Sequence, residues 1–156
     1  ANDDAWNWRI GGKAVAFSPL RGAPFWGGGR ITLGSSDQNS STGQGYVFAE
    51  GMVTWEATKD IAINVNPKVA LSGAGDLWGF GISTNLKLFP GWELIPEGNI
   101  VINESSQSNA TLGVRWHATD SIAIEAYGST AASLLDIGQL INAEQVRWGG
   151  RVLMSF

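Results

Sequence analysis

The stretch GVRWHATDSIAIEAY, residues 113–127, decides the fold class, and the chain repeats it closely as MVTWEATKDIAINVN at residues 52–66. Apolar residues occupy every second position on either side of Thr119–Ser121. That alternation has the period of a β-strand and not of a helix. Thr119–Ser121 consists of residue types that favour tight turns. The stretch therefore predicts a β-hairpin, and the near copy predicts a second hairpin of the same design.

One register matches the two strands of the later hairpin on both faces. Pairing Trp116 with Ile124 on the apolar face also sets Arg115 opposite Glu125 on the polar face. Opposite charges directly across a strand pair stabilise that pairing. We therefore predict this register for the hairpin.

The earlier copy follows the same rule. Its turn falls at Lys59-Asp60, so that Ala57 meets Ile61 on the apolar face and Glu50 meets Lys68 on the polar face. The shared plan indicates that both hairpins meet the same surroundings on each face.

A third hairpin is predicted in STNLKLFPGWELIPEG, residues 83–98, with a Pro-Gly turn at its centre. The best register sets Lys87 opposite Glu93 and Leu88 opposite Trp92. Pro and Gly are typical turn residues, because Pro fixes its own φ and Gly accepts positive φ.

Composition excludes several classes of protein. The chain has 156 residues, no Cys, one His and a formal net charge of -4. Disulfide frames and thiolate chemistry are excluded, zinc sites have almost no ligands, and a nucleic-acid surface would need clustered Lys and Arg. We therefore expect no metal, no cofactor and no nucleic-acid partner. No apolar run approaches the roughly 18 to 20 residues that a membrane helix requires.

The connections between strands alternate between very short and long, which distinguishes the two ends of the sheet. A soluble sandwich is the plain alternative, with one face in the core and the other in water. Transmembrane barrels, however, have short turns at one end and longer loops at the other, with strands of about 9–11 residues. The long connections are residues 35–45, 72–77, 103–109 and 129–144.

Aromatic residues fall near the predicted strand ends. Indole rings favour the level of the lipid headgroups, because one edge is polar and the rest is apolar. We predict six membrane-interface aromatics: Trp55, Trp78, Trp92, Trp116, Trp148 and Phe156.

The last stretch, VRWGGRVLMSF at residues 146–156, alternates apolar residues with arginines and ends on Phe156. It resembles the final strand of Gram-negative outer-membrane β-barrel proteins as a general class, and no narrower family is identified. The resemblance implies an integral protein of the bacterial outer membrane, with the lipid bilayer and the barrel-insertion machinery, which reads the C-terminal strand, as partners. It also places Phe156 and the short turns on the periplasmic side.

The expected fold is all-β: an antiparallel up-and-down transmembrane β-barrel that forms a single domain over residues 1–156. Residues 6–17 read as a clear strand, and residues 25–34 as a weaker, Gly-rich one. Bacterial barrels have even strand numbers. Eight strands are therefore favoured, with residues 18–45 as one external excursion. The alternative is nine or more strands, with the chain as the C-terminal portion of a larger barrel completed by further strands or subunits.

Successive side chains of a strand point to opposite faces of the sheet, and this alternation predicts that a set of charged residues points into the barrel lumen. They carry both signs, and buried charges are tolerated only when paired. The set lines a selective pore or simply holds the lumen together, and both readings remain open. The predicted lumen-lining residues are Glu50, Lys68, Lys87, Glu93, Arg115, Glu125, Arg147 and Arg151.

The predicted function is a porin-like channel, or a membrane anchor whose external loops bind a partner. The alternative is a soluble lipocalin-like β-barrel that binds a small apolar ligand in its interior. We predict no enzymatic activity: His117, Ser121 and Glu125 lie near one hairpin, but His117 and Glu125 are eight residues apart along extended chain. Within 129–144, the run AASLLDIGQLI is apolar enough to form a short helix folded into the lumen or over its mouth, or simply a loop packed on its own strands.

Overall fold

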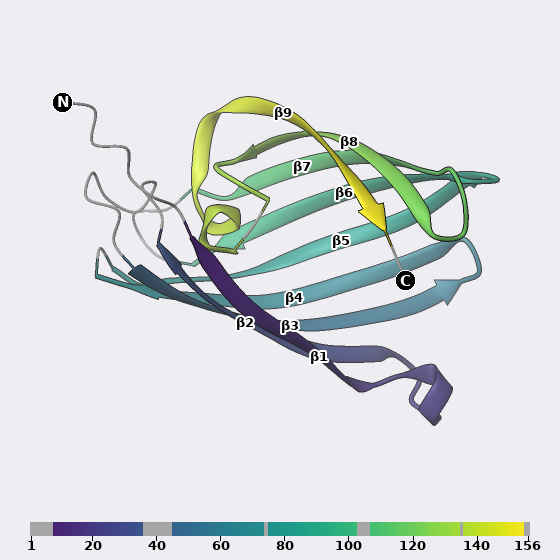
Figure 1. Cartoon of the computed structure of the whole chain (residues 1–156), viewed down its shortest axis with the longest axis horizontal. Helices are drawn as coiled ribbons and strands as arrows, with labels where there is room; N and C mark the ends of the chain where they lie inside the picture. Colours follow the sequence, from purple (N-terminus) through teal and green to yellow (C-terminus); the bar gives the residue numbers. More distant parts are fainter. Residues whose placement is uncertain (1–7, 36–44, 74, 103–106, 135, 155–156) are drawn as a thin grey trace.

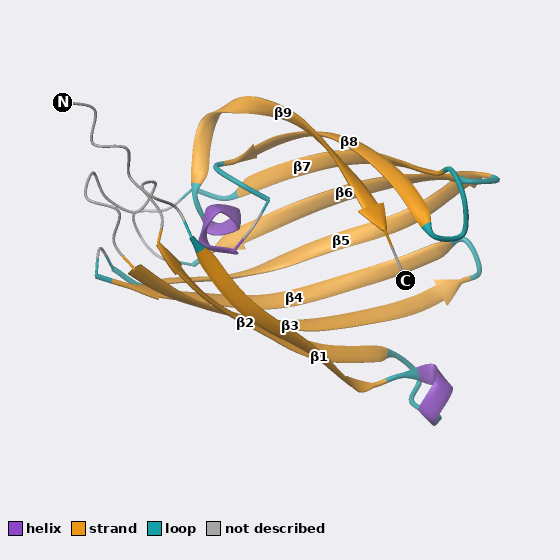
Figure 2. Cartoon of the chain, in the orientation of Figure 1, coloured by secondary structure: helices purple, strands orange, loops and turns teal. Residues whose placement is uncertain are grey.

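The computed structural model describes residues 8–35, 45–73, 75–102, 107–134 and 136–154. The described chain forms one antiparallel sheet of nine strands, in which every strand pairs with its neighbours in sequence (Figure 1). Two short 3-10 helices interrupt it, η1 (Pro19–Arg21) and η3 (Asp136–Leu140) (Figure 2). The strands are β1 (Arg9–Phe17), β2 (Trp26–Ser35), β3 (Gly45–Thr58), β4 (Ile61–Ser72), β5 (Leu77–Phe89), β6 (Trp92–Val101), β7 (Asn109–His117), β8 (Ile122–Ala131) and β9 (Asn142–Met154).

The preference for eight strands is wrong, because residues 18–45 are not one excursion. β2 lies within that range and pairs with β1 on one side and β3 on the other. Its glycines let the backbone of β1 approach closely, since a Cβ atom at Gly28 would lie 2.3 Å from the carbonyl oxygen of Ala14. They contribute no side chains to an alternating pattern. A Gly-rich strand of this kind has little hydrophobic pattern, although its backbone pairing is regular.

The sheet is not closed. β1 and β9 are the edge strands, and each pairs with a single neighbour. Because neighbouring strands alternate in direction, the first and ninth strands run the same way. Figure 1 shows the sheet curving along its width, with η3 inside the curve.

The predicted hairpin registers are confirmed over the body of each hairpin. Arg115 pairs with Glu125 and Trp116 with Ile124. The register of the earlier copy sets Glu50 opposite Lys68, as expected.

The predicted registers fail only next to two turns, where irregularities shift the pairing by one residue. Thr58, rather than Ala57, lies opposite Ile61. Phe89, rather than Leu88, lies opposite Trp92. An extra residue on one strand of a pair is a β-bulge, which increases the local twist.

The two ends of the sheet differ in the described connections. The turns after β3, β5 and β7 lie at one end, together with the segment 18–25 that contains η1 (Figure 1). The connection from β8 to β9, which contains η3, lies at the opposite end. We call these the short-turn end and the loop end.

The two faces of the sheet have opposite chemistry. The concave face buries charged and amide side chains, among them Lys68 at 3% and Asn99 at 2% exposure. The other face exposes apolar side chains in every strand, for example Ile31 at 60% and Val65 at 41%. The hydrophobic core is small and lies around Phe48, against η3. No helix among the described residues is long and apolar enough to cross a membrane.

Candidate functional site

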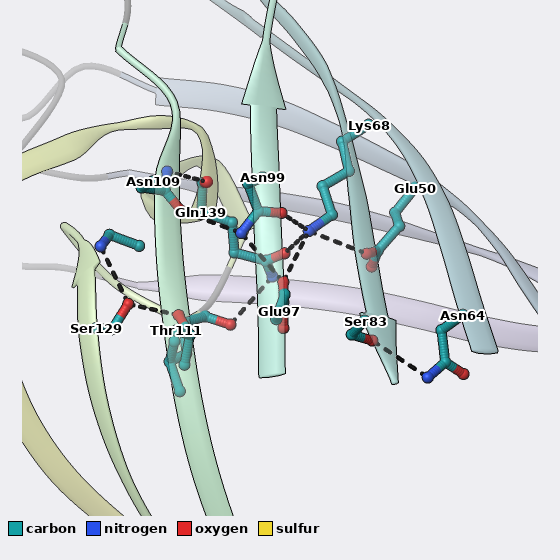
Figure 3. Close-up of polar contacts among 12 residues, drawn as sticks. Glu50, Asn64, Lys68, Ser83, Glu97, Asn99, Asn109, Thr111, Ser129 and Gln139 are labelled. Atoms are coloured by element: carbon teal, nitrogen blue, oxygen red, sulfur yellow. Dashed lines mark hydrogen bonds and ion pairs between the residues drawn. The ribbon is translucent and has the colours of Figure 1, made fainter. Parts of the chain in front are cut away.

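A lysine with no exposed side-chain surface lies at the centre of the concave face. The Nζ atom of Lys68 donates to Oδ1 of Asn99 at 2.5 Å and to Oε1 of Gln139. Carboxylate oxygens of Glu97 and Glu50 lie 3.4 and 3.8 Å from the same Nζ atom. Figure 3 shows the partner side chains converging from β3, β6 and the η3 segment on Lys68, which lies on β4. We call these five residues the Lys68 cluster.

Helix η3 is buried over its whole length and is held to the sheet by its first residue. Oδ2 of Asp136 accepts a hydrogen bond from Oη of Tyr46 at 3.2 Å. The guanidinium groups of Arg30 and Arg9 lie 3.4 and 3.6 Å from the same carboxylate. At the other end of the helix, Leu140 is fully buried in the small hydrophobic core. Of the two predicted alternatives for this run, a short helix and a loop packed on its own strands, the structure shows a short 3-10 helix, and it lies against the concave face of the sheet.

Amide and hydroxyl side chains connect the Lys68 cluster to β7 and β8. Nδ2 of Asn99 donates to Oδ1 of Asn109 at 3.1 Å, and Nδ2 of Asn109 donates to the carbonyl oxygen of Gln139 at 2.8 Å. The hydroxyls of Thr111 and Ser129 are 2.6 Å apart (Figure 3). The backbone and side chain of Gln139 are thus both bound to the sheet, which fixes η3 in one position.

A second charged group crosses β6 to β9 nearer the short-turn end. Arg115 donates to Oε2 of Glu125 at 2.8 Å and lies 3.3 Å from Oε2 of Glu93. Arg151 lies 2.7 Å from Oε1 of Glu125, and Nε2 of His117 lies 3.2 Å from Oε1 of Glu93. We call the row Glu93, Arg115, Glu125 and Arg151 the ion-pair ladder. Opposite charges alternate from strand to strand along it, so each inner member has a partner on both sides.

The two remaining predicted lumen residues have different partners. Lys87 lies opposite Glu93 in the register, but its Nζ atom donates to the carbonyl oxygen of Lys59 at 3.2 Å. Arg147 donates to the carbonyl oxygen of Ala132 at 2.8 Å. All eight predicted residues lie on strands, and the structure brings six of them into the Lys68 cluster and the ion-pair ladder.

A cavity of ≈ 390 Å³ separates the two charged groups. Its walls carry both signs of charge, and its lining comes from both edge strands as well as the middle of the sheet. The charged residues that line it are Lys13, Arg30, Glu50, Glu97, Arg115, Glu125 and Arg151. The lining therefore offers charges of both signs and hydrogen-bonding groups, a chemistry that suits polar solutes.

The predicted interface aromatics that the structure describes lie on the opposite face. Trp55, Trp78, Trp116 and Trp148 are 54%, 52%, 42% and 83% exposed. The ring of Trp92 stacks on that of Trp116, with centroids 6.1 Å apart. Phe156 lies outside the described residues.

Sequence reasoning missed several members of the site. Asn99 and Gln139 carry no charge, and Tyr46 directly follows the polar segment 35–45. Asp136 lies within the run AASLLDIGQLI, outside the predicted strands, so strand alternation gives no signal for it. Asn99 could have been predicted, because it lies two residues after Glu97 in the same strand and therefore points to the same face. The contact between Asp136 and Tyr46 joins residues 90 positions apart, and no local signal predicts it.

The structure does not bring His117 and Glu125, which the sequence places near one hairpin, into contact with each other. Glu125 pairs with two arginines, and His117 with Glu93, so His117 and Glu125 are engaged elsewhere and not with each other. No group of three or more described His, Asp or Glu side chains is placed to hold a metal ion.

Comparison with known proteins assigns no role to this geometry. The chemistry of the site is therefore inferred from its own contacts. No protein family, curated protein or solved structure matches the chain.

Proposed function

We propose that the chain forms the wall of a transmembrane β-barrel of the bacterial outer membrane and works as a porin-like channel, with a charged lumen narrowed by η3. The observation that carries this proposal is the inverted distribution of side chains. Charged residues are buried on the concave face, whereas Ile, Val, Leu and Trp side chains are exposed on the other. A lipid bilayer solvates such an apolar surface, and water does not.

The same observation disfavours a soluble lipocalin-like barrel. A barrel of that type holds an apolar ligand inside, so its inward residues are apolar. Here the inward positions of β4 include Asn64, Asn66 and Lys68, and the outward positions include Ile63 and Val65. An apolar ligand on the concave face would remove these polar groups from their partners.

Two adjacent residues of β4 test membrane insertion directly. Val65 is exposed on the apolar face, and Asn66 lines the charged cavity. We expect Val65→Arg to destabilise the protein folded in lipid vesicles, lowering its free energy of unfolding by about 2–4 kcal/mol, and Asn66→Arg to lower it by clearly less. Urea titration of vesicle-refolded protein, followed by tryptophan fluorescence, gives both values. A harmless Val65→Arg beside a ruinous Asn66→Arg would support the soluble barrel instead.

Conductance separates a channel from a membrane anchor. The cavity beside η3 is lined by charged groups of both signs, which include members of the Lys68 cluster and of the ion-pair ladder. Protein inserted into planar bilayers should give discrete current steps whose size changes when η3 is released from the sheet. Insertion without any current would leave the anchor function, in which the loops bind an external partner.

A further inference from the structure

The edge strands β1 and β9 leave a gap in the wall of the sheet. Each presents one row of backbone N–H and C=O groups to no other strand of the described chain. Lipid supplies no hydrogen bonds to such groups, so an open sheet edge lowers stability within the hydrocarbon region. In the native membrane, further polypeptide that covers both edges removes this cost.

The lumen side of the strands beside this gap is cationic. β1 and β2 contain no Asp or Glu, and the only carboxylate of β9 is Glu144, near its loop end. The carboxylates described above lie on β3, β6, β8 and η3. The cations on the lumen side of the three strands are Arg9, Lys13, Arg30, Arg147 and Arg151.

Part of this charge has no carboxylate partner. Within the described chain, no ion pair joins Lys13 or Arg147 to an Asp or Glu. Arg151, at the end of the ion-pair ladder, is 41% exposed and pairs on one side only, with Glu125. Lys13 and Arg151 line the same cavity, although they belong to opposite edges. The alternation of charge along the ladder therefore stops at a cation, and the next charge across the gap is another cation.

Direct closure of β1 on β9 conflicts with both observations. The two strands run in the same direction, so they would pair in parallel, unlike every other pair of the sheet. Closure would also bring Lys13 toward Arg151, and like charges directly opposite destabilise a strand pair. A second copy offers no better partner, because two copies inserted in the same orientation present strands that run the same way.

We propose that the gap is filled by an odd number of β-strands in which the strands next to β1 and β9 run opposite to them and carry Asp or Glu on the lumen side. An odd number keeps every pair antiparallel. Carboxylates placed opposite Lys13 and Arg151 continue the alternation of the ion-pair ladder and neutralise the cationic wall. This inference rests on the proposed membrane function, and it adds the direction, parity and charge of the missing partner.

The chain itself offers a suitable probe, because β8 already pairs antiparallel with β9 on its inner side and places a carboxylate opposite Arg151. A synthetic peptide with the β8 sequence, IAIEAYGSTA, presents the carboxylate of Glu125 to Arg151 in the native register. We would measure its binding to the folded chain in detergent micelles by fluorescence anisotropy. The matched control peptide carries Lys in place of that Glu. We expect the Glu peptide to bind about tenfold more tightly than the Lys peptide, because Glu attracts the edge cations and Lys is repelled by them.

Variants of the edge cations test whether the preference arises at the gap. Lys13→Glu should reduce or reverse the preference, and Lys13→Glu combined with Arg147→Glu should reverse it. Lys87→Glu makes the same charge change away from both edges and should leave the preference intact. Equal binding of the two peptides, or a preference that survives the Lys13 and Arg147 variants, overturns the inference.

Crosslinking tests the direction independently of charge. A cysteine at the N-terminus of the Glu peptide should form disulfides with Met154→Cys, at the short-turn end of β9, and not with Val146→Cys, nearer the loop end. The reverse pattern indicates parallel pairing and contradicts the proposal, as does self-association of the chain that the peptide fails to displace. The Val65→Arg and Asn66→Arg comparison decides membrane insertion separately, so the inference can fail while the proposed function stands.

Discussion

Replacing Lys68 by Met should destabilise the protein and release η3 from the sheet. The Met side chain has similar length and no charge, so the change removes the ammonium group with little change in volume. Two close acceptors, on Asn99 and Gln139, and two nearby carboxylates, on Glu97 and Glu50, lose their shared cation.

The expected magnitude comes from the contacts that are lost. Hydrogen bonds to a charged group contribute about 1.5–3 kcal/mol each, and Lys68 donates two close ones. Breaking a buried charge cluster by removing one partner typically costs about 3–5 kcal/mol. Glu50 keeps Arg30 at 2.9 Å, which limits the loss. We therefore expect the free energy of unfolding to fall by about 3–5 kcal/mol.

Urea titration in lipid vesicles measures this loss, and limited proteolysis measures the release of η3. Cleavage between β8 and β9 should become faster in Lys68→Met than in the wild type. Lys87→Met is the matched control, because Lys87 also lies on the lumen side but is exposed and donates to one backbone carbonyl. It should change stability by less than about 0.5 kcal/mol. If Lys68→Met is as stable as the wild type and its η3 segment remains protected, Lys68 does not hold η3 in place.

Two further predictions concern the ladder and the topology. Arg115→Met should lower the free energy of unfolding by about 2–4 kcal/mol in the same titration, because the buried Glu125 and the partly buried Glu93 lose their common cation. Arg115→Lys should recover only part of this loss, since one ammonium group cannot reproduce the guanidinium fork. In intact cells, a membrane-impermeant thiol reagent should label Gln107→Cys, at the loop end, and not Asp120→Cys, at the short-turn end. Labelling of Asp120→Cys alone would place the short turns outside the cell.

The hairpin registers could be predicted from sequence because both faces of each strand carry information. Arg115 can face Glu125 only in the register that also matches Trp116 with Ile124, so a shift by one residue breaks both faces at once. The bulges beside two turns could not be predicted, because they depend on local twist. In both hairpins the extra residue lies on the first strand, one position before the last residue of that strand, at Ala57 and Leu88.

The candidate site was predictable in part. Charged members such as Lys68 follow from strand parity, whereas the docking of η3 depends on contacts between distant segments. β2 was predicted only as a weak strand and was left out of the favoured count of eight, because Gly27–Gly29 contributes backbone pairing but no side-chain pattern. The sequence left open whether the barrel closes on itself or needs further strands, since closure depends on how far the whole sheet curves and not on any single strand.

The sheet order also determines how the chain can assemble. Each strand pairs with its neighbours in sequence, so the sheet can grow one hairpin at a time with short loop closures, which favours fast pairing. The η3 segment is the exception, because Gln139 and Asp136 bind residues 71 and 90 positions earlier in the chain. Those partners lie on β4 and β3, and the contacts of Asn109 come from β7. Docking of η3 therefore requires β3, β4 and β7 to be in place, so protection of this segment from protease reports a late step of folding.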